Sequence, residues 1–233
     1  MARILMVVSS ADALTMKDGS SHPTGVWAEE LVVAHRTLRE AGHSVQLASP
    51  GGVKPTIDAA SLDPEQIGGA AKAEDFRSYL ADIDNELSSP LVLAHVSASD
   101  FDGVVMPGGH GPMADLAENK DFGRILVETN NAGKVIAPFC HGPAGLLSAV
   151  NEDGGFAFAG RRMTVFTNEE ELAGGTGENT PWFVEDVLRE RGAVLETSAA
   201  WSSVVVRDGN LITGQNPQSS EDVAKEVIKA LAG

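Results

Sequence analysis

Short apolar runs alternate with longer amphipathic stretches along the chain, and this alternation predicts an α/β fold. The apolar runs end at turn-forming residues, which is typical of strands that are buried on both faces. The predicted strands are residues 4–8, 44–48, 102–106, 134–139 and 163–166. The predicted helices are residues 26–41, 74–87, 121–131, 178–191 and 219–231, and a helix-like segment covers 144–150. We therefore expect a mostly parallel sheet with helices on both of its faces.

Turn residues mark the limits of several of these elements. Thr24 is placed to cap the first helix, and Gly42 is placed to end it. The Asp208-Gly209 pair lies between two apolar runs, which predicts a hairpin over residues 204–212. Residues 51–98 are less regular and too long for a plain connection. We expect them to form a lid or cap inserted within a single domain of residues 1–233.

Composition and charge narrow the classes of function. The net charge of -16, from 33 acidic and 17 basic residues, offers no cationic surface for nucleic acid. No apolar run reaches the roughly 18 residues of a membrane-spanning helix. The first apolar run is too short for the core of a signal peptide, so we expect a cytoplasmic protein with no membrane partner. The single cysteine excludes an intrachain disulfide, and the 6 histidines show no metal-ligand spacing, so no metal is expected.

Cys140 is the most informative residue of the sequence. It comes directly after the predicted strand 134–139 and before the helix-like segment, which is the layout of a nucleophile elbow. Such a turn places a thiol above the edge of the sheet, and the N–H groups of a following helix favour its thiolate. Gly142 permits the tight turn. We predict that Cys140 is a reactive nucleophile.

The neighbouring histidines and glycines are candidates to complete this site. The backbone N–H of His141 is positioned to serve an oxyanion hole, while its side chain is expected to point away from Cys140, toward a substrate or an acid. The turn 107–111 follows another buried strand and should lie beside the elbow. There Gly109 and His110 are expected to supply the second oxyanion donor, with the His110 side chain as a substrate contact.

Taken together, these motifs resemble the ThiJ/PfpI superfamily over nearly the whole chain. The resemblance rests on the first strand, the Met106-Pro107-Gly108-Gly109-His110-Gly111 turn, the Cys140-His141-Gly142-Pro143-Ala144 elbow, and the Thr213-Gly214-Gln215-Asn216-Pro217 turn. Thr24-Gly25-Val26 and the long segment after Gly51 look most like the chaperone and glyoxalase III branch. The resemblance implies a flavodoxin-like sandwich of the class I glutamine amidotransferase type and a homodimer.

The resemblance also implies two acidic residues at the site. A glutamate of the first helix should be hydrogen-bonded to the cysteine, and the family spacing selects Glu30 and leaves Glu29 in solvent. A second acid, which orients the histidine, should follow Phe166-Thr167-Asn168, where Glu169, Glu170 and Glu171 all stand; spacing favours Glu171. Pro138 departs from the family pattern and removes a backbone donor beside the nucleophile.

The function implied by the resemblance is that of a glyoxalase III, which acts on a small α-oxoaldehyde such as methylglyoxal without glutathione, cofactor or metal. In this hypothesis Cys140 forms a hemithioacetal, and Glu30 and His141 move protons through an enediol to give D-lactate. Two alternatives use the same thiol. One is a cysteine hydrolase, as an amidase, peptidase or deglycase. The other is a holding chaperone or oxidation sensor, because an accessible low-pKa thiol oxidises readily.

Overall fold

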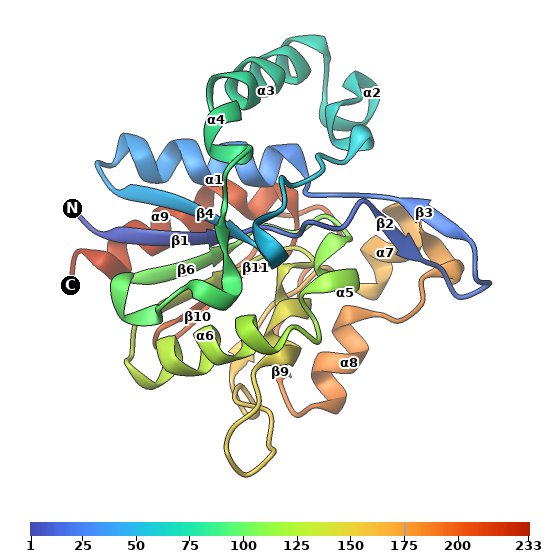
Figure 1. Cartoon of the computed structure of the whole chain (residues 1–233). Coiled ribbons are helices and arrows are strands. Elements are labelled where there is room, and N and C mark those ends of the chain that lie inside the picture. The colour runs from blue at the N-terminus through green and yellow to red at the C-terminus, as the bar shows by residue number, and fades with distance from the viewer. Residues whose placement is uncertain (175) are drawn as a thin grey trace.

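A sheet of seven strands lies at the centre of residues 1–174 and 176–233, which are the residues that this computed structural model describes (Figure 1). In spatial order the strands are β10 (Val205–Asp208), β11 (Leu211–Gly214), β7 (Val135–Pro138), β6 (Gly103–Met106), β1 (Arg3–Val7), β4 (Ser44–Ser49) and β5 (Leu91–Val92). Neighbouring strands run parallel except β10, which pairs antiparallel with β11. The predicted mostly parallel sheet and the Asp-Gly hairpin are confirmed.

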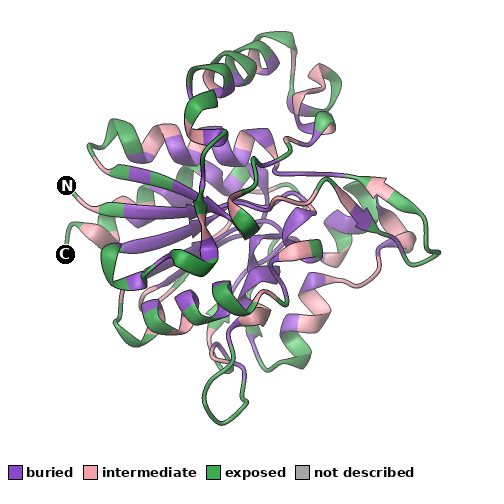
Figure 2. Cartoon of the chain, viewed as in Figure 1, coloured by how far each residue is buried: buried purple, intermediate pink, exposed green. Residues whose placement is uncertain are grey.

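Helices cover both faces of this sheet, as the alternation predicts. On one face α1 (Ala28–Glu40) packs beside α9 (Ser220–Leu231). The other face is covered by α5 (Gly111–Asp115), α6 (Lys120–Asn131), α8 (Val184–Glu190) and a 3₁₀ helix, Gly142–Ser148. Figure 2 shows the strands buried along most of their length and the outer faces of the helices exposed. The fold is the expected flavodoxin-like sandwich.

Strand β1 shows how the sequence builds this core. Ile4 and Met6 pack with the side chains of α1 and α9, whereas Leu5 and Val7 pack with those of α6 on the opposite face. Successive residues of a strand point to opposite faces. An unbroken apolar run is therefore what a strand covered on both sides requires.

The remaining elements lie outside the central layers. Residues 51–98 include α2 (Pro64–Ile67), α3 (Ala70–Asp82) and α4 (Asp84–Leu87), and α3 packs on the outer side of α1. Two small sheets are formed by β2 (Ala13–Thr15) with β3 (Ser21–Pro23) and by β8 (Arg162–Met163) with β9 (Val194–Leu195). Helix α7 (Asn168–Gly174) follows β8. The β2–β3 hairpin projects from the edge of the molecule beside α7 (Figure 1).

Several predicted boundaries are wrong for identifiable reasons. The N-cap of α1 is Trp27 rather than Thr24, because the Thr24 hydroxyl donates to the Asp58 carboxylate at 3.1 Å. Helix α8 begins at Val184, after the turn that contains Pro181. The predicted helix 74–87 is divided into α3 and α4.

Two further predictions differ in the type or length of the element. The predicted strand 163–166 is reduced to the two residues Arg162–Met163. The chain after Met163 turns toward Cys140 instead of continuing the strand, and the Phe166 N–H donates to the Cys140 carbonyl at 3.0 Å. The helix-like segment after the elbow is a 3₁₀ helix, Gly142–Ser148.

Candidate active site

Cys140 lies on a sharp turn at the carboxyl end of β7. Its φ angle is 57°, a left-handed conformation that is rare for a residue with a side chain and that marks a constrained position. The Cys140 N–H donates to the Gly214 carbonyl at 2.9 Å, and the Gly142 N–H donates to the Phe139 carbonyl at 2.8 Å. These bonds hold the turn on both sides of the thiol. The sequence prediction of an elbow at this position is therefore realised in the backbone.

Pro138 removes one ladder bond without bending the strand away from its neighbours. On the side of β11, the Ile136 N–H donates to Asn210 at 3.0 Å and the Cys140 N–H donates to Gly214. Pro138 lies midway between these donors and has no N–H. On the side of β6 it keeps its register opposite Met106. Proline at position 138 therefore removes one hydrogen bond of the sheet next to the elbow. The hydrogen bonds donated by Ile136 and Cys140, on either side of Pro138, still hold Cys140 in position.

Burial raises the pKa of the Cys140 thiol, and two backbone N–H groups from different turns act against this rise. They belong to His141, on the elbow, and to Gly109, on the glycine turn after β6. Gly109 has a φ angle of 81°, and a Cβ atom there would lie 2.2 Å from the Gly25 carbonyl oxygen, so a larger residue would not fit. This pair of donors can stabilise negative charge on sulfur or on an adjacent oxygen. The expectation that Gly109 supplies an oxyanion donor stays a prediction.

Glu30 reaches the thiol from the first turn of α1. Its side chain is fully buried, and one carboxyl oxygen accepts a 2.5 Å hydrogen bond from the Gly108 N–H. Among the residues that the structure describes, its other carboxyl oxygen has no hydrogen-bond partner within normal distance, and the Cys140 thiol is near enough to influence the pKa of this carboxyl. Burial raises the pKa of Glu30 to about 8, so the carboxyl holds its proton at neutral pH. Glu29 points the other way and pairs with Lys72 of α3 at 2.6 Å rather than standing free in solvent.

The resting thiol is protonated, contrary to the expectation that the elbow favours a thiolate. Burial raises the pKa of the Cys140 thiol, and an ionised Glu30 would raise it further. The residue is only 3% exposed, and the short 3₁₀ helix that follows presents a weaker dipole than a full α-helix. Two acids in such close contact do not both ionise in a buried site. A thiolate at this position therefore requires a base that removes the thiol proton.

His141 is placed to be that base. Its Nδ1 lies 3.4 Å from the Cys140 sulfur, and its Nε2 lies 2.6 Å from Glu171 Oε2. The expectation that its side chain points away from Cys140 is wrong. In an extended strand consecutive side chains diverge, but the left-handed conformation of Cys140 turns the two side chains toward each other. Burial, followed by the charge of His110, lowers the pKa of His141, so the ring is neutral at pH 7.

Glu171 is the acid that contacts the histidines. Its carboxylate also accepts a hydrogen bond from His110 Nε2 at 2.9 Å, and it contacts the hydroxyls of Thr176 and Thr180. Burial opposes its ionisation, but the two histidine rings outweigh that cost and hold the pKa of Glu171 well below its usual range. A carboxylate that accepts from Nε2 of both rings fixes the tautomer that leaves each Nδ1 as an acceptor.

The other two glutamates of this run point elsewhere. Glu169 is exposed, because successive positions of a helix point about 100° apart. Glu170 is fully buried and accepts hydrogen bonds from the N–H groups of Thr167 and Trp201 and from the Asn216 amide. It joins α7 to the turn after β11 and carries a structural role that sequence reasoning did not assign. Which of the three candidate acids contacts the histidines depends on which face of α7 packs against the site.

The His110 ring lies in the site, and its centroid is 4.2 Å from that of the His141 ring. The expected contact of this side chain with a substrate stays a prediction. It also lines a cavity of about 440 Å³ whose walls include Asp12, Trp27 and Asp58. The side chain of His110 is 16% exposed, compared with 2% for His141. His110 is therefore the ring through which this cavity meets the buried site.

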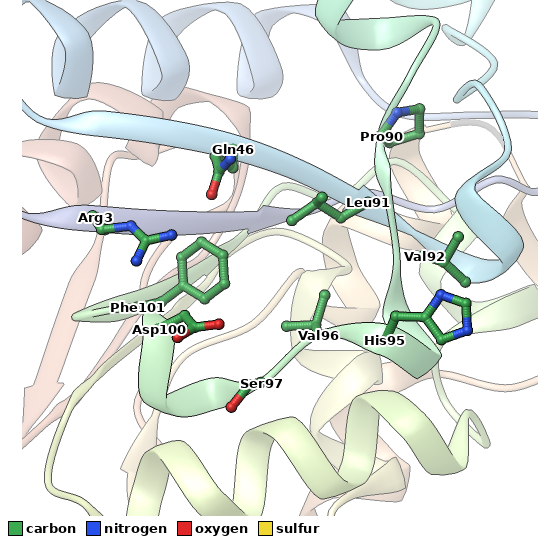
Figure 3. A pocket seen from close by; sticks show the side chains of 10 residues that line it. All are labelled: Arg3, Gln46, Pro90, Leu91, Val92, His95, Val96, Ser97, Asp100 and Phe101. Atoms are coloured by element: carbon green, nitrogen blue, oxygen red, sulfur yellow. The ribbon is translucent and has the colours of Figure 1, made fainter.

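A second hollow, of about 480 Å³, lies away from this site. It is lined by residues of β1, β4 and the segment after α4, among them Arg3, Leu91 and Phe101 (Figure 3). Neither Cys140 nor any residue that contacts it belongs to this lining. Of these two hollows, the cavity at His110 is the one whose lining includes residues bonded to Glu171, namely His110 and Thr176.

Three ligating side chains of the site lie close enough to share a metal ion. The ligand atoms of His110, His141 and Glu171 lie within 4.8 Å of one another, although sequence spacing gave no such indication. The Nε2 atoms of both rings and both Glu171 oxygens are engaged in the hydrogen bonds described above. A metal there would take the base away from Cys140, so the arrangement suits proton transfer rather than metal binding.

The family model described as DJ-1/PfpI matches residues 23–230. The chain belongs to the DJ-1/PfpI family. A glutathione-independent glyoxalase of Saccharomyces cerevisiae is 30% identical, with 98% of each chain covered. A protein/nucleic acid deglycase of Pseudomonas aeruginosa is 26% identical, with 98% of this chain and 80% of the relative covered. The crystal structure of glyoxalase III from Candida albicans superposes with a TM-score of 0.84 at 28% identity, covering 98% of this chain and 97% of the other.

As a member of the DJ-1/PfpI family, the chain shares its fold with these relatives. Within residues 1–174 and 176–233 no helix is both long and apolar enough to cross a membrane. The resemblance inferred from the elbow and the glycine turn is confirmed. The roles of the individual side chains are proposals, which follow from their geometry.

Proposed function

We propose that this protein is a glutathione-independent glyoxalase that converts methylglyoxal to D-lactate with Cys140 as nucleophile. The observation that carries the proposal is the position of the thiol between two groups of opposite function. A protonated Glu30 carboxyl lies on one side, and the neutral His141, 3.4 Å from the sulfur, lies on the other. Relatives over nearly the full chain include glyoxalases.

The first step is attack of sulfur on the aldehyde carbon. His141 Nδ1 takes the thiol proton as the C–S bond forms, and Glu171 stabilises the resulting imidazolium. The N–H groups of Gly109 and His141 and the Glu30 carboxyl stabilise the developing oxyanion. The proton then passes to that oxygen, which gives a neutral hemithioacetal.

The next steps move one proton between the two carbons. Loss of the C1 proton gives an enediolate, the proton of the C1 hydroxyl passes to the C2 oxygen, and protonation at C2 gives a lactoyl thioester on Cys140. Water then hydrolyses the thioester and releases lactate and the thiol. Overall C1 is oxidised and C2 is reduced, so no external oxidant, reductant or cofactor is needed.

The cavity at His110 suits a small neutral aldehyde. Its volume of about 440 Å³ exceeds that of methylglyoxal, and its lining includes Asp12 and Asp58 but neither lysine nor arginine. Acidic walls attract no anionic substrate and repel the lactate anion once it forms. This charge pattern supports a neutral aldehyde rather than a phosphorylated or carboxylated one as the substrate.

The direct test is an assay with purified protein, methylglyoxal, a chelator and no added thiol. We expect one D-lactate for each methylglyoxal consumed, measured with a D-specific lactate dehydrogenase. The rate with the chelator should lie within about twofold of the rate without it. Added glutathione should not accelerate it. Absence of D-lactate under these conditions would overturn the proposed function.

The dependence of activity on pH should be bell-shaped. His141 must be neutral to accept the thiol proton, and burial lowers its pKa, so activity should rise at a pH below 6.5. Glu30 must hold its proton, and its pKa is about 8, so activity should be full below that value and fall as pH rises through it. The measurement is kcat/KM against pH for the wild type and Glu30→Gln. The variant should lose the fall near pH 8, and a wild-type profile still rising above it would contradict the assignment.

A deglycase function is the alternative that a specific observation favours, because several relatives bear that name. The same thiol could attack a glycated amine or thiol. Release of free amine from a methylglyoxal-treated peptide, at a rate faster than the enzyme removes free methylglyoxal, would identify this activity.

The homodimer and the cytoplasmic location expected from the sequence remain part of the proposal. Sedimentation of the purified chain tests the first, and fractionation of the source cells tests the second.

A further inference from the structure

His110 and His141 share one carboxylate. Their Nε2 atoms lie 2.9 Å and 2.6 Å from the two different oxygens of Glu171, and their ring centroids are 4.2 Å apart. Each ring therefore has the same tautomer and the same orienting acid. A carboxylate that orients a neutral imidazole is the arrangement that makes its second nitrogen an effective base. The site thus contains two oriented bases.

The two free nitrogens face different places. His141 Nδ1 lies at the Cys140 sulfur. His110 Nδ1 has no hydrogen-bond partner among residues 1–174 and 176–233, and the His110 ring lines the cavity where an aldehyde would enter. On its outer side the His110 ring meets His22 edge-on, with centroids 6.1 Å apart. A substrate bound to Cys140 from this cavity would lie beside His110.

The geometry points to His110 as the base that carries the proton from C1 to C2 of the hemithioacetal. This inference rests on the proposed glyoxalase function. After His141 has returned the thiol proton to the substrate oxygen, His110 Nδ1 removes the C1 proton, and the electron pair of the C–H bond forms the C1–C2 double bond of an enediolate. The proton of the C1 hydroxyl then passes to the C2 oxygen. His110 Nδ1 finally delivers the proton it took from C1 to C2, which leaves the neutral thioester and the neutral ring.

Alternate charging of the two rings explains why one carboxylate serves both. Protonation of one ring raises the cost of protonating the other at this separation. His141 is charged only while the C–S bond forms, and His110 only while the carbon proton moves. Glu171 therefore compensates one imidazolium at a time. The order of the two steps ensures this, because the hemithioacetal must exist before its C1 proton is acidic.

The test separates formation of the adduct from its isomerisation. In His110→Gln the amide can still donate to Glu171 from a position like that of Nε2, but it is not a base. We expect kcat for D-lactate to fall about 10²-fold, the range for loss of a general base. The Cys140–methylglyoxal adduct, followed by intact-protein mass spectrometry, should form at the wild-type rate and accumulate. Imidazole should restore part of the activity of His110→Ala, because the cavity has room for it.

His95→Gln, an exposed histidine outside the site, is the matched control and should behave as wild type in both measurements. Lactate formation by His110→Gln at the wild-type rate would overturn the assignment. Equal slowing of adduct formation and of lactate formation would also overturn it, because His110 would then act only through the thiol. A wild type that forms no lactate would instead overturn the proposed function itself.

Discussion

Cys140→Ala is expected to abolish conversion of methylglyoxal, with kcat reduced by at least about 10³-fold, the scale on which loss of a covalent nucleophile is measured. The sulfur lies 3.4 Å from Nδ1 of the proposed base His141, and the Glu30 carboxyl and the Gly109 N–H are near enough to influence the pKa of the thiol. Without it no C–S bond forms, and the hemithioacetal that activates the C1 proton is absent.

The variant should fold as the wild type does. Alanine has the same preference against a φ angle of 57° as cysteine, so the backbone strain of the elbow is unchanged. The unfolding temperature measures this point. Variant activity within tenfold of the wild type, in a folded protein, would contradict the role of Cys140.

Mass spectrometry of the wild type reports the chemistry class directly, because the chain has a single cysteine. Exposure to methylglyoxal should add the mass of one aldehyde to the peptide that contains Cys140. Exposure to a panel of amides and esters should add no acyl group. A stable acyl adduct with no aldehyde adduct would identify a hydrolase instead.

Glu171→Gln is expected to lower kcat about 10²- to 10³-fold with a smaller change in KM. An amide presents one oxygen acceptor and one N–H₂ donor, so it cannot accept from His110 and His141 together. The ring that loses its acceptor can adopt the other tautomer. If that ring is His141, a proton then sits on Nδ1, where it faces sulfur and cannot accept the thiol proton. A carboxylate-to-amide change acts through the wrong tautomer in the same way in serine proteases, at a cost of about 10⁴.

Two matched variants of the same helix show whether the effect belongs to Glu171. Glu169→Gln changes an exposed neighbour and should leave kcat and the unfolding temperature unchanged. Glu170→Gln disturbs the buried contacts to Thr167, Trp201 and Asn216, so it should lower the unfolding temperature more than Glu169→Gln does. Adduct formation should slow in Glu171→Gln. A normal rate of adduct formation would show that His141 does not depend on this acid.

Segments with strong periodicity were predicted well. The buried strands β1, β4, β6 and β7 each appear as apolar runs, and α6 and α9 begin within one residue of the predicted positions. The short hairpin of β2 and β3 gave no such signal, because three-residue strands are too short to show a period. The first helix starts later than predicted because Thr24 is used by Asp58, a partner 34 residues away in the sequence.

The sequence by itself determined the position of the cysteine elbow and the fold. An apolar run that ends in Cys-His-Gly requires a strand followed by a tight turn, and this local rule does not depend on the rest of the chain. The resemblance added Glu30. The tertiary structure decided which glutamate of 169–171 meets the histidines, that His141 turns toward sulfur, and that His110 shares the same acid. It also decided the ionisation of the thiol, because the pKa of a buried group depends on desolvation by residues that the sequence does not place next to it.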